Sequence, residues 1–452
     1  ILGKKFLSLY EDSQSINTAV IGITLDSLLG RIKILEATMD GDSLQKILLL
    51  PVPSAKPITF IYPDIPLQQV NIVNNLFYYY IYWLAQEGNL NEQLSNVRKF
   101  LEKVALSDKS LKWVMPWAAL QPSVVDIWLS DYWVPTSKPQ GEKIFGPYTI
   151  QGFSAIQQFF TRINAEPILN KIYGEEISRF EKAYQIQREA EWRKFLLGFD
   201  AGRDLLVTNA TWQEILSTLG GANSPYARLS NRILLEYPSS GSIRNRPGWV
   251  SSIEFIQTLR ESALSESYFG DLVSKLKVLA AISKLNNSNQ GTQEKDISES
   301  RTLFKTYADA FNKVLTAAIS SPGNAGGLAI NFSGLGVDPT IKTSVMRDAA
   351  EALQRLVDKV GVKNQPWNEP GWVLLEGALK TTIAYTYNQA ACTMQSAWNS
   401  NIIYPTKLAT TEAEMFQKTF GEQGTLWTFI DKTAKPFLTI SGSDFINTLI
   451  DG

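Results

Sequence analysis

Apolar residues recur along most of the chain at the three- and four-residue spacing that places them on one face of an α-helix. A representative stripe lies between Val345 and Val360, and Gly361 next to it predicts the C-terminal end of this helix. Its apolar members are Val345, Met346, Ala349, Ala350, Leu353, Leu356, Val357 and Val360. The same periodicity elsewhere predicts a chain made chiefly of helices.

Three further helices follow from local signals. Trp212, Ile215, Leu216 and Leu219 lie on one helical face before Gly220-Gly221, which predicts a helix that ends at the glycines. Ser224 followed by Pro225 has the pattern of an N-cap and a first helical residue, and we expect that helix to stop before Pro238. Residues 175–199 carry charges throughout and apolar residues at helical spacing, so we predict the longest helix there.

Strand signals are sparse, and the best one is residues 58–62, between two prolines. The sequence therefore predicts a mainly α fold of several packed helical subdomains with few short strands. A chain of 452 residues exceeds the ~250–300 at which one core stops growing. Polar or Gly/Pro-rich stretches at 135–147, 286–299 and 320–336 indicate seams, the second of them a mobile linker. We predict an N-terminal subdomain at 1–146, a middle one at 147–290 and a C-terminal one at 291–452.

Charge and composition narrow the class of partner. The net charge is −1 and no segment concentrates Lys and Arg, so nucleic acid is not an expected partner and proteins are. The apolar stretch at 76–85 is about half the ~20 residues that cross a bilayer. The chain opens on Ile1 without an initiator Met, and we expect it to be a piece of a longer polypeptide.

Candidate chemistry is limited by what the sequence lacks. There is no histidine, which excludes histidine-activated nucleophiles, histidine general bases and histidine-ligated metals. The single cysteine, Cys392, cannot form an internal disulfide or a thiolate zinc site, and its apolar neighbours predict a buried thiol. No phosphate-binding GxxxxGK[ST] pattern occurs. We therefore predict no catalytic residue, no cofactor and no metal.

A series of short motifs, in order along the chain, resembles the periplasmic region of the IcmF/TssM family. They are Trp113 and Trp117, Asp131-Tyr132-Trp133, Pro147-Tyr148-Thr149 with Gly152-Phe153, Trp192 to Leu196, Trp212 to Leu216, Asn223 to Tyr226, Gln395 to Trp398, Tyr404-Pro405, Phe416, Phe420-Gly421, Gly424 to Phe429 and Pro436-Phe437. The resemblance covers roughly residues 76–437. Members of that family anchor type VI secretion systems or the related type IVB (Dot/Icm) system.

The resemblance implies a non-enzymatic helical scaffold in the bacterial cell envelope, the periplasmic portion of a protein anchored in the inner membrane. The partners it implies are a DotU/TssL-like inner-membrane protein, other subunits of the secretion complex, further copies of the chain and an outer-membrane lipoprotein. Type VI members usually continue into a β-sandwich that contacts this lipoprotein. This chain ends at Gly452, near where that sandwich would begin, which favours the type IVB branch over type VI and leaves both open.

Aromatic and acidic residues leave a second interpretation open. The twelve tryptophans suit carbohydrate binding, although Trp192 and Trp212 are expected in the core because of their helical spacing. Five other aromatic residues are predicted to bind partners: Trp249, Trp367, Trp372, Tyr404 and Trp427. The first three adjoin Pro- or Gly-containing loops and are the candidates for exposed contact residues. Paired carboxylates drawn from Asp126, Asp131, Glu369 and Glu376 would instead suit an α-helical glycosidase or peptidoglycan-binding protein.

Overall fold

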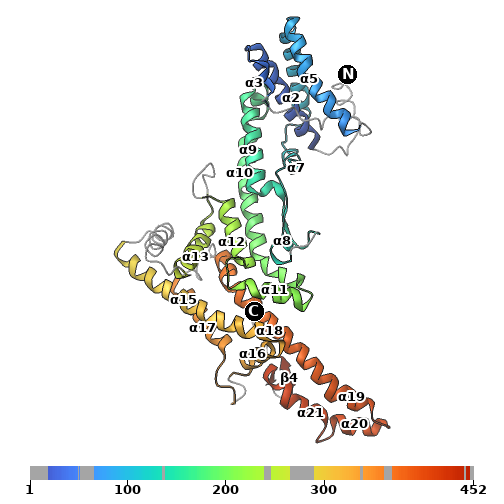
Figure 1. Cartoon of the computed structure of the whole chain (residues 1–452), viewed down its shortest axis with the longest axis vertical. Helices are drawn as coiled ribbons and strands as arrows, with labels where there is room; N and C mark the ends of the chain where they lie inside the picture. Colours follow the sequence, from blue (N-terminus) through green and yellow to red (C-terminus); the bar gives the residue numbers. More distant parts are fainter. Residues whose placement is uncertain are drawn as a thin grey trace. The chain divides into compact units, whose positions relative to one another are not determined.

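A computed structural model describes most of the chain (Figure 1). The described residues are 19–48, 50, 66–134, 138–238, 246–264, 290–335, 340–360, 369–441 and 444–447. The predicted mainly α fold is confirmed, with the strands in the described part limited to β1 (Ile127–Trp128), β2 (Lys143–Ile144), β3 (Leu438–Ser441) and β4 (Asp444–Asn447). The last two pair antiparallel, with Leu438 opposite Asn447. The strand predicted at 58–62 lies outside the described residues.

The contacts divide the chain into two compact units. Unit 1 consists of Ile1–Ile127 and Lys143–Trp192, and unit 2 of Trp128–Glu142 and Arg193–Gly452. The division falls within the helix α10 (Pro167–Leu197). The predicted subdomain boundaries at residues 146 and 290 stay a prediction. Over the ranges that the structure describes, no helix combines the length and the apolar character needed to cross a membrane.

Unit 1 is built from helices on either side of a core of aromatic residues. Besides α10, they are α2 (Ala19–Met39), α3 (Leu44–Leu48), α5 (Leu67–Gln86), α6 (Leu90–Ser107), α7 (Val114–Ala119) and α9 (Ile150–Ala165). Trp113 and Trp117 both contact Phe159 of α9, with ring centroids 5.8 and 4.1 Å apart. A Cβ on Gly22 of α2 would lie 2.7 Å from Trp117. The absence of a side chain there allows α2 to pack directly on the tryptophans.

The predicted turn before a helix is present at residues 146–149. A 3-10 turn, η1 (Gly146–Tyr148), leads into α9, and the Thr149 hydroxyl accepts a hydrogen bond from the Gly152 N–H at 3.2 Å as an N-cap. Three side chains spaced four residues apart on α10 donate to the carbonyls of this turn. Tyr184 donates to Pro147 at 2.6 Å, and Arg188 and Trp192 donate to Tyr148 at 2.9 and 3.0 Å. These hydrogen bonds satisfy carbonyls that would otherwise be buried without partners.

Unit 2 contains the remaining α-helices of the described chain. Short helices come first along the sequence, and longer helices that pack into a bundle come after them. The α-helices of unit 2 are α8 (Ser130–Trp133), α11 (Asn209–Leu219), α12 (Pro225–Glu236), α13 (Gly248–Leu264), α15 (Gln290–Ser320), α16 (Pro322–Gly334), α17 (Val345–Val360), α18 (Glu369–Trp398), α19 (Tyr404–Lys407), α20 (Glu412–Phe420) and α21 (Thr425–Phe429). Figure 1 shows α16 and α17 near α18, against which both pack. α18 therefore serves as the central helix of this bundle.

An aromatic cluster joins the short helices of unit 2 to α18. The rings of Trp133, Phe199 and Tyr226 lie within 5.4–5.5 Å of one another, centroid to centroid. The Tyr226 hydroxyl hydrogen-bonds Asp200 at 2.6 Å and Thr381 of α18 at 2.8 Å. Burial raises the pKa of Tyr226 well above its ordinary value, so it stays a neutral phenol. Gly202 and Gly377 give the Trp133 and Tyr226 rings the space that they occupy.

Most helices predicted from periodicity are confirmed. α17 spans Val345–Val360 and α11 ends at Leu219. α12 begins at Pro225 behind the Ser224 N-cap and ends at Glu236. α10 begins earlier than predicted, at Pro167, and its 31 residues are equalled by α15.

Two stretches predicted as loop-like are helical where the structure describes them. α15 begins at Gln290, inside the stretch predicted as a mobile linker. α16 occupies most of the Gly-rich stretch at 320–336. The glycines permit close packing there, because a Cβ on Gly326 would lie 3.4 Å from the Ala390 backbone of α18.

Candidate protein-docking surface

Large apolar side chains are exposed on the short helices near the C-terminal end of unit 2. Tyr404 of α19 is 64% exposed, Phe416 and Phe420 of α20 are 61% and 49% exposed, and Trp427 of α21 is 43% exposed. We call this set the C-terminal surface: Tyr404, Leu408, Met415, Phe416, Phe420 and Trp427. Clustered aromatic and Met side chains are typical of protein interfaces, whereas single exposed apolar residues are ordinary.

A small core holds these helices in place. Ile402, Phe429 and Ala434 are buried together, and the Phe429 ring meets Trp398 of α18 edge to face at 5.3 Å. Phe429 thus anchors α21 on its inner side, while Trp427, two residues earlier, lies at the solvent. Side chains two residues apart on a helix point in directions about 200° apart. The short helix α21 can therefore bury Phe429 and expose Trp427 at the same time.

The exposed rings are also tied to one another. Phe416 and Phe420, one helical turn apart, have ring centroids 5.3 Å apart. The indole N–H of Trp427 donates to the Phe420 carbonyl at 3.2 Å, which links α21 to the end of α20. Pre-positioned aromatic side chains lose little entropy on binding, which suits a docking surface.

The N-terminus of α20 is stabilised by a capping network around Glu414. The Thr411 hydroxyl accepts from the Glu414 N–H at 3.2 Å, and the Glu414 carboxylate accepts from the Thr410 N–H at 2.9 Å and the Thr410 hydroxyl at 2.7 Å. Lys418 lies 2.6 Å from the same carboxylate. The hydrogen bond from Lys418 and then those from Thr410 lower the pKa of Glu414 from 4.5 to about 2.

We expect acid to loosen this cap at an unusually low pH. A carboxyl group whose pKa is lower in the folded state stabilises the fold above its unfolded pKa, and that contribution is lost as the pH falls through the folded pKa. The window for Glu414 therefore runs from about 4.5 down to about 2. Carbon NMR titration of the Glu414 carboxyl should give the low midpoint, and Lys418→Met should raise it. A midpoint of about 4.5 in the unmodified chain would show that the network does not form.

An apolar groove of about 490 Å³ adjoins the C-terminal surface. It is lined by Tyr387, Ala390, Ala391, Met394, Gln395, Trp398, Phe429, Ala434, Phe437 and Leu438. Burial raises the pKa of Tyr387, whose hydroxyl also hydrogen-bonds Ser333, so the ring stays neutral. The described lining has no ionisable group that is charged at neutral pH, so the groove suits an apolar side chain of a partner rather than a charged substrate.

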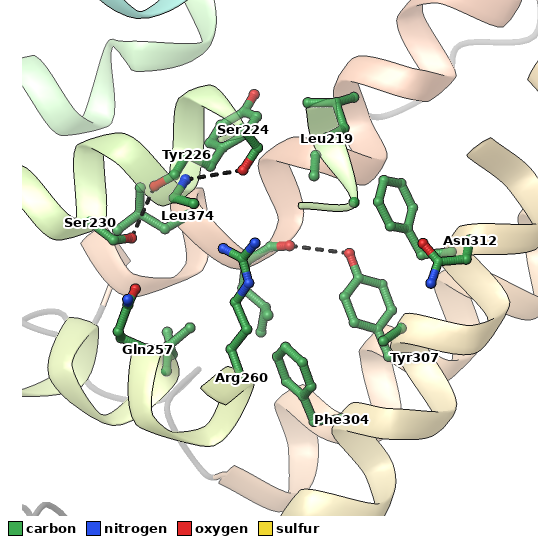
Figure 2. Close-up of a pocket in the computed structure, with 17 residues that line it drawn as sticks. Leu219, Ser224, Tyr226, Ser230, Gln257, Arg260, Phe304, Tyr307, Asn312 and Leu374 are labelled. Carbon is green, nitrogen blue, oxygen red and sulfur yellow. Dashed lines mark hydrogen bonds between the residues drawn. The ribbon is translucent and has the colours of Figure 1, made fainter. Parts of the chain in front are cut away.

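A second pocket lies among α11, α12, α13, α15 and α18 (Figure 2). Its volume is only about 90 Å³, whereas ligand pockets usually measure ~300–1,000 Å³. Arg260 points into it, donates to the Gly221 carbonyl just after α11, and has a pKa lowered by burial. Tyr307 donates to the Leu375 carbonyl at 3.2 Å. We interpret this pocket as a gap in the packing of the helices. Arg260, which caps the end of α11, lies at its edge.

Three of the four acidic residues considered for glycosidase chemistry have local structural partners. Asp126 accepts from the Gly146 N–H at 2.7 Å and pairs with Lys143 at 2.5 Å. Asp131 accepts from the Trp128 N–H at 2.8 Å, and Glu376 pairs with Lys380 one turn later at 3.1 Å. The Glu369 side chain lies outside the described residues. In the described ranges, no group of three or more Cys, Asp or Glu side chains could hold a metal ion.

The five residues predicted to bind partners divide into three groups. Tyr404 and Trp427 are exposed and belong to the C-terminal surface. The expectation that Trp249 and Trp372 are exposed is wrong, because they are only 2% and 9% exposed. Trp249 packs edge to face on Tyr237, with ring centroids 5.8 Å apart, so its ring faces the interior. Trp367 lies outside the described residues.

Sequence reasoning missed the other members of the C-terminal surface. Phe416 and Phe420 are spaced as one helical face, which was a usable signal, but the pattern alone does not say whether that face is covered. Cys392 was also misplaced, since it is exposed on α18. Ala390 faces α16, and Cys392 lies about 200° further round the same helix.

Comparison of the chain with protein-family models, with curated protein sequences and with solved structures finds no match.

Proposed function

We propose that this protein is a helical scaffold that assembles with other proteins of the bacterial cell envelope, as part of a secretion complex of the IcmF/TssM kind. The observation that carries the proposal is the C-terminal surface, where anchored aromatic side chains stand exposed beside an uncharged groove. Such a surface suits the binding of another protein. We propose a secretion complex in particular because the motifs from Trp113 to Phe437 resemble those of the IcmF/TssM family.

The proposed partner at the C-terminal surface is another subunit of that complex, of which the resemblance names a DotU/TssL-like inner-membrane protein. In this proposal the chain is the periplasmic portion of an inner-membrane-anchored protein of a type IVB or type VI system, and it has no catalytic role. Its function then depends on shape and stability. The buried aromatic cores of both units support this, since they provide rigid platforms for the exposed side chains.

Replacing Phe416, Phe420 and Trp427 together with serine should abolish partner binding while leaving the fold intact. Each central aromatic residue of an interface contributes ~2 kcal/mol or more, so we expect at least a tenfold loss of the DotU/TssL-like protein that co-purifies with the full chain from detergent-solubilised membranes. Secretion of substrate proteins by the same cells should fall in parallel.

Leu235→Ser is the matched control, because Leu235 is 67% exposed on α12, outside the C-terminal surface. The control should retain both co-purification and secretion. Equal co-purification by the triple variant would count against the proposed docking surface. Peptidoglycan hydrolysis by the purified chain, lost on Glu369→Gln or Glu376→Gln, would instead establish the carbohydrate-active alternative.

A further inference from the structure

α5 has two apolar faces, and the described residues of its own unit cover only one of them. Phe77, Tyr78, Ile81 and Leu84 are at most 8% exposed. This buried face is directed at α2, beside which α5 lies in Figure 1, and the Arg31 guanidinium of α2 sits 4.6 Å from the Phe77 ring centre. The buried face accounts for the folding of α5 onto unit 1.

The other face is apolar and exposed. Ile72 is 58%, Leu76 54%, Tyr79 73%, Tyr80 41% and Trp83 51% exposed. At about 100° per residue these five side chains fall within an arc of about 100° on the side opposite Ile81. Tyr82, 53% exposed, lies about 60° outside this arc, on the side of Tyr79. We call the six residues the α5 stripe.

The α5 stripe is uncharged, so it does not select a partner of opposite charge. The helix Leu67–Gln86 contains no Asp, Glu, Lys or Arg, and its polar residues are Gln, Asn and Tyr. Helices that lie on anionic membranes have Lys and Arg on the polar face, which α5 lacks. An uncharged stripe can face an identical stripe without like-charge repulsion, and the Tyr hydroxyls can both donate and accept hydrogen bonds across it.

The exposed area is also of the size that a symmetric pair needs. If each of the six side chains offers about 180 Å² when fully exposed, their exposed fractions leave roughly 600 Å² on one copy. Two copies that cover all six side chains would then bury at most about 1,200 Å², which is the lower limit for stable protein interfaces. This area predicts a reversible dimer rather than an obligate one.

We propose that the α5 stripe is a self-association surface, through which two copies of this chain pack α5 against α5 about a two-fold axis. The inference rests on the proposed scaffold function and adds to it a second surface, on unit 1, with a second copy as its occupant. A scaffold with one surface for itself and another for a different subunit can multiply the number of partner sites in one assembly.

Sedimentation velocity of the chain between about 1 and 100 µM tests the proposal. We expect a concentration-dependent shift from monomer to dimer, with half dimerisation in the micromolar range that a small interface gives. Tyr79→Ser combined with Trp83→Ser should raise the dissociation constant at least tenfold. Val207→Ser, a change at an 85% exposed apolar residue of unit 2, is the matched control and should leave it unchanged. An unmodified chain that stays monomeric at 100 µM overturns the proposal.

A disulfide test identifies the face that dimerises. Cys392 is the only cysteine, so Leu76→Cys in a Cys392→Ser background places one thiol near the middle of the α5 stripe. Oxidation should link two copies through that thiol, whereas Val207→Cys in the same background should not link them. A dimer in sedimentation without a Leu76→Cys cross-link would mean that another face is used, which also overturns the proposal.

Two further measurements separate this inference from the proposed function. The double α5 variant should still co-purify with the DotU/TssL-like protein, because the C-terminal surface is unchanged. A chain that dimerises through α5 but does not capture that protein would leave the inference standing and the proposed function unsupported. Flotation with phosphatidylglycerol vesicles that requires Trp83 would assign the stripe to a membrane surface and overturn the inference.

Discussion

Gly202→Ala should destabilise unit 2 by about 3 kcal/mol, the upper end of the usual range for overpacking a core. A Cβ at this position would lie 2.0 Å from Cδ1 and 2.1 Å from Nε1 of the Trp133 indole. The indole cannot simply move away, because Trp133 is 1% exposed and packs against Phe199 and Tyr226 at 5.5 Å each. Relief of the clash therefore requires the whole aromatic cluster to shift.

Urea unfolding followed by circular dichroism measures the loss, and hydrogen exchange of the amides in 199–205 locates it. Local exchange is needed because a chain of two units need not unfold in one step. Gly327→Ala is the control, since it lies within α16 and a Cβ there meets nothing within 4 Å. An alanine in that helix should stabilise by ~0.5–1 kcal/mol. Equal effects of the two substitutions would show that the indole does not occupy the space beside Gly202.

The confirmed predictions concern features that neighbouring residues determine. The stripe of α17 and the Ser224-Pro225 start of α12 both depend on contacts within one or two helical turns, so sequence spacing is enough to recognise them. Trp192 and Trp212 were correctly placed in the core for the same reason, since their helices have a single apolar face. Helix positions and the buried faces of amphipathic helices were therefore predictable.

The errors concern features that distant residues determine. The sequence of the Gly-rich stretch suggests a loop, but the structure shows the helix α16. Its glycines let α18 approach closely at Ala390, a contact that the sequence pattern does not reveal. Trp249 follows a Pro-Gly turn that suggested exposure, yet Tyr237 of another segment covers it. Whether an apolar face is covered depends on the tertiary arrangement, which sequence periodicity does not contain. The same reason explains why the exposure of Phe416 and of the α5 stripe was not predicted.

Trp113→Ala should be the most damaging single substitution in unit 1, with an expected loss of ~3–5 kcal/mol. Trp113 is 0% exposed and meets Phe159 and Tyr173 edge to face, with ring centroids 5.8 and 5.9 Å apart. A Cβ on Gly22 would lie 2.8 Å from its Cε3 atom, so α2 also rests on this ring. Its removal leaves a cavity among α2, α9 and α10 that these helices cannot close without losing their other contacts.

Trp113→Phe separates the effect of ring size from that of the indole N–H. The Nε1 atom of Trp113 is buried and has no hydrogen-bond partner in the described part of the chain, which costs ~1–3 kcal/mol of folding stability. Phenylalanine gives up some packing but removes that unsatisfied donor, so we expect a net loss below ~1.5 kcal/mol. Hydrogen exchange of the α2 and α9 amides measures both variants. A loss for Trp113→Phe as large as that for Trp113→Ala would mean that the N–H is bonded after all, through a buried water, and that the polar contact contributes as much as the packing.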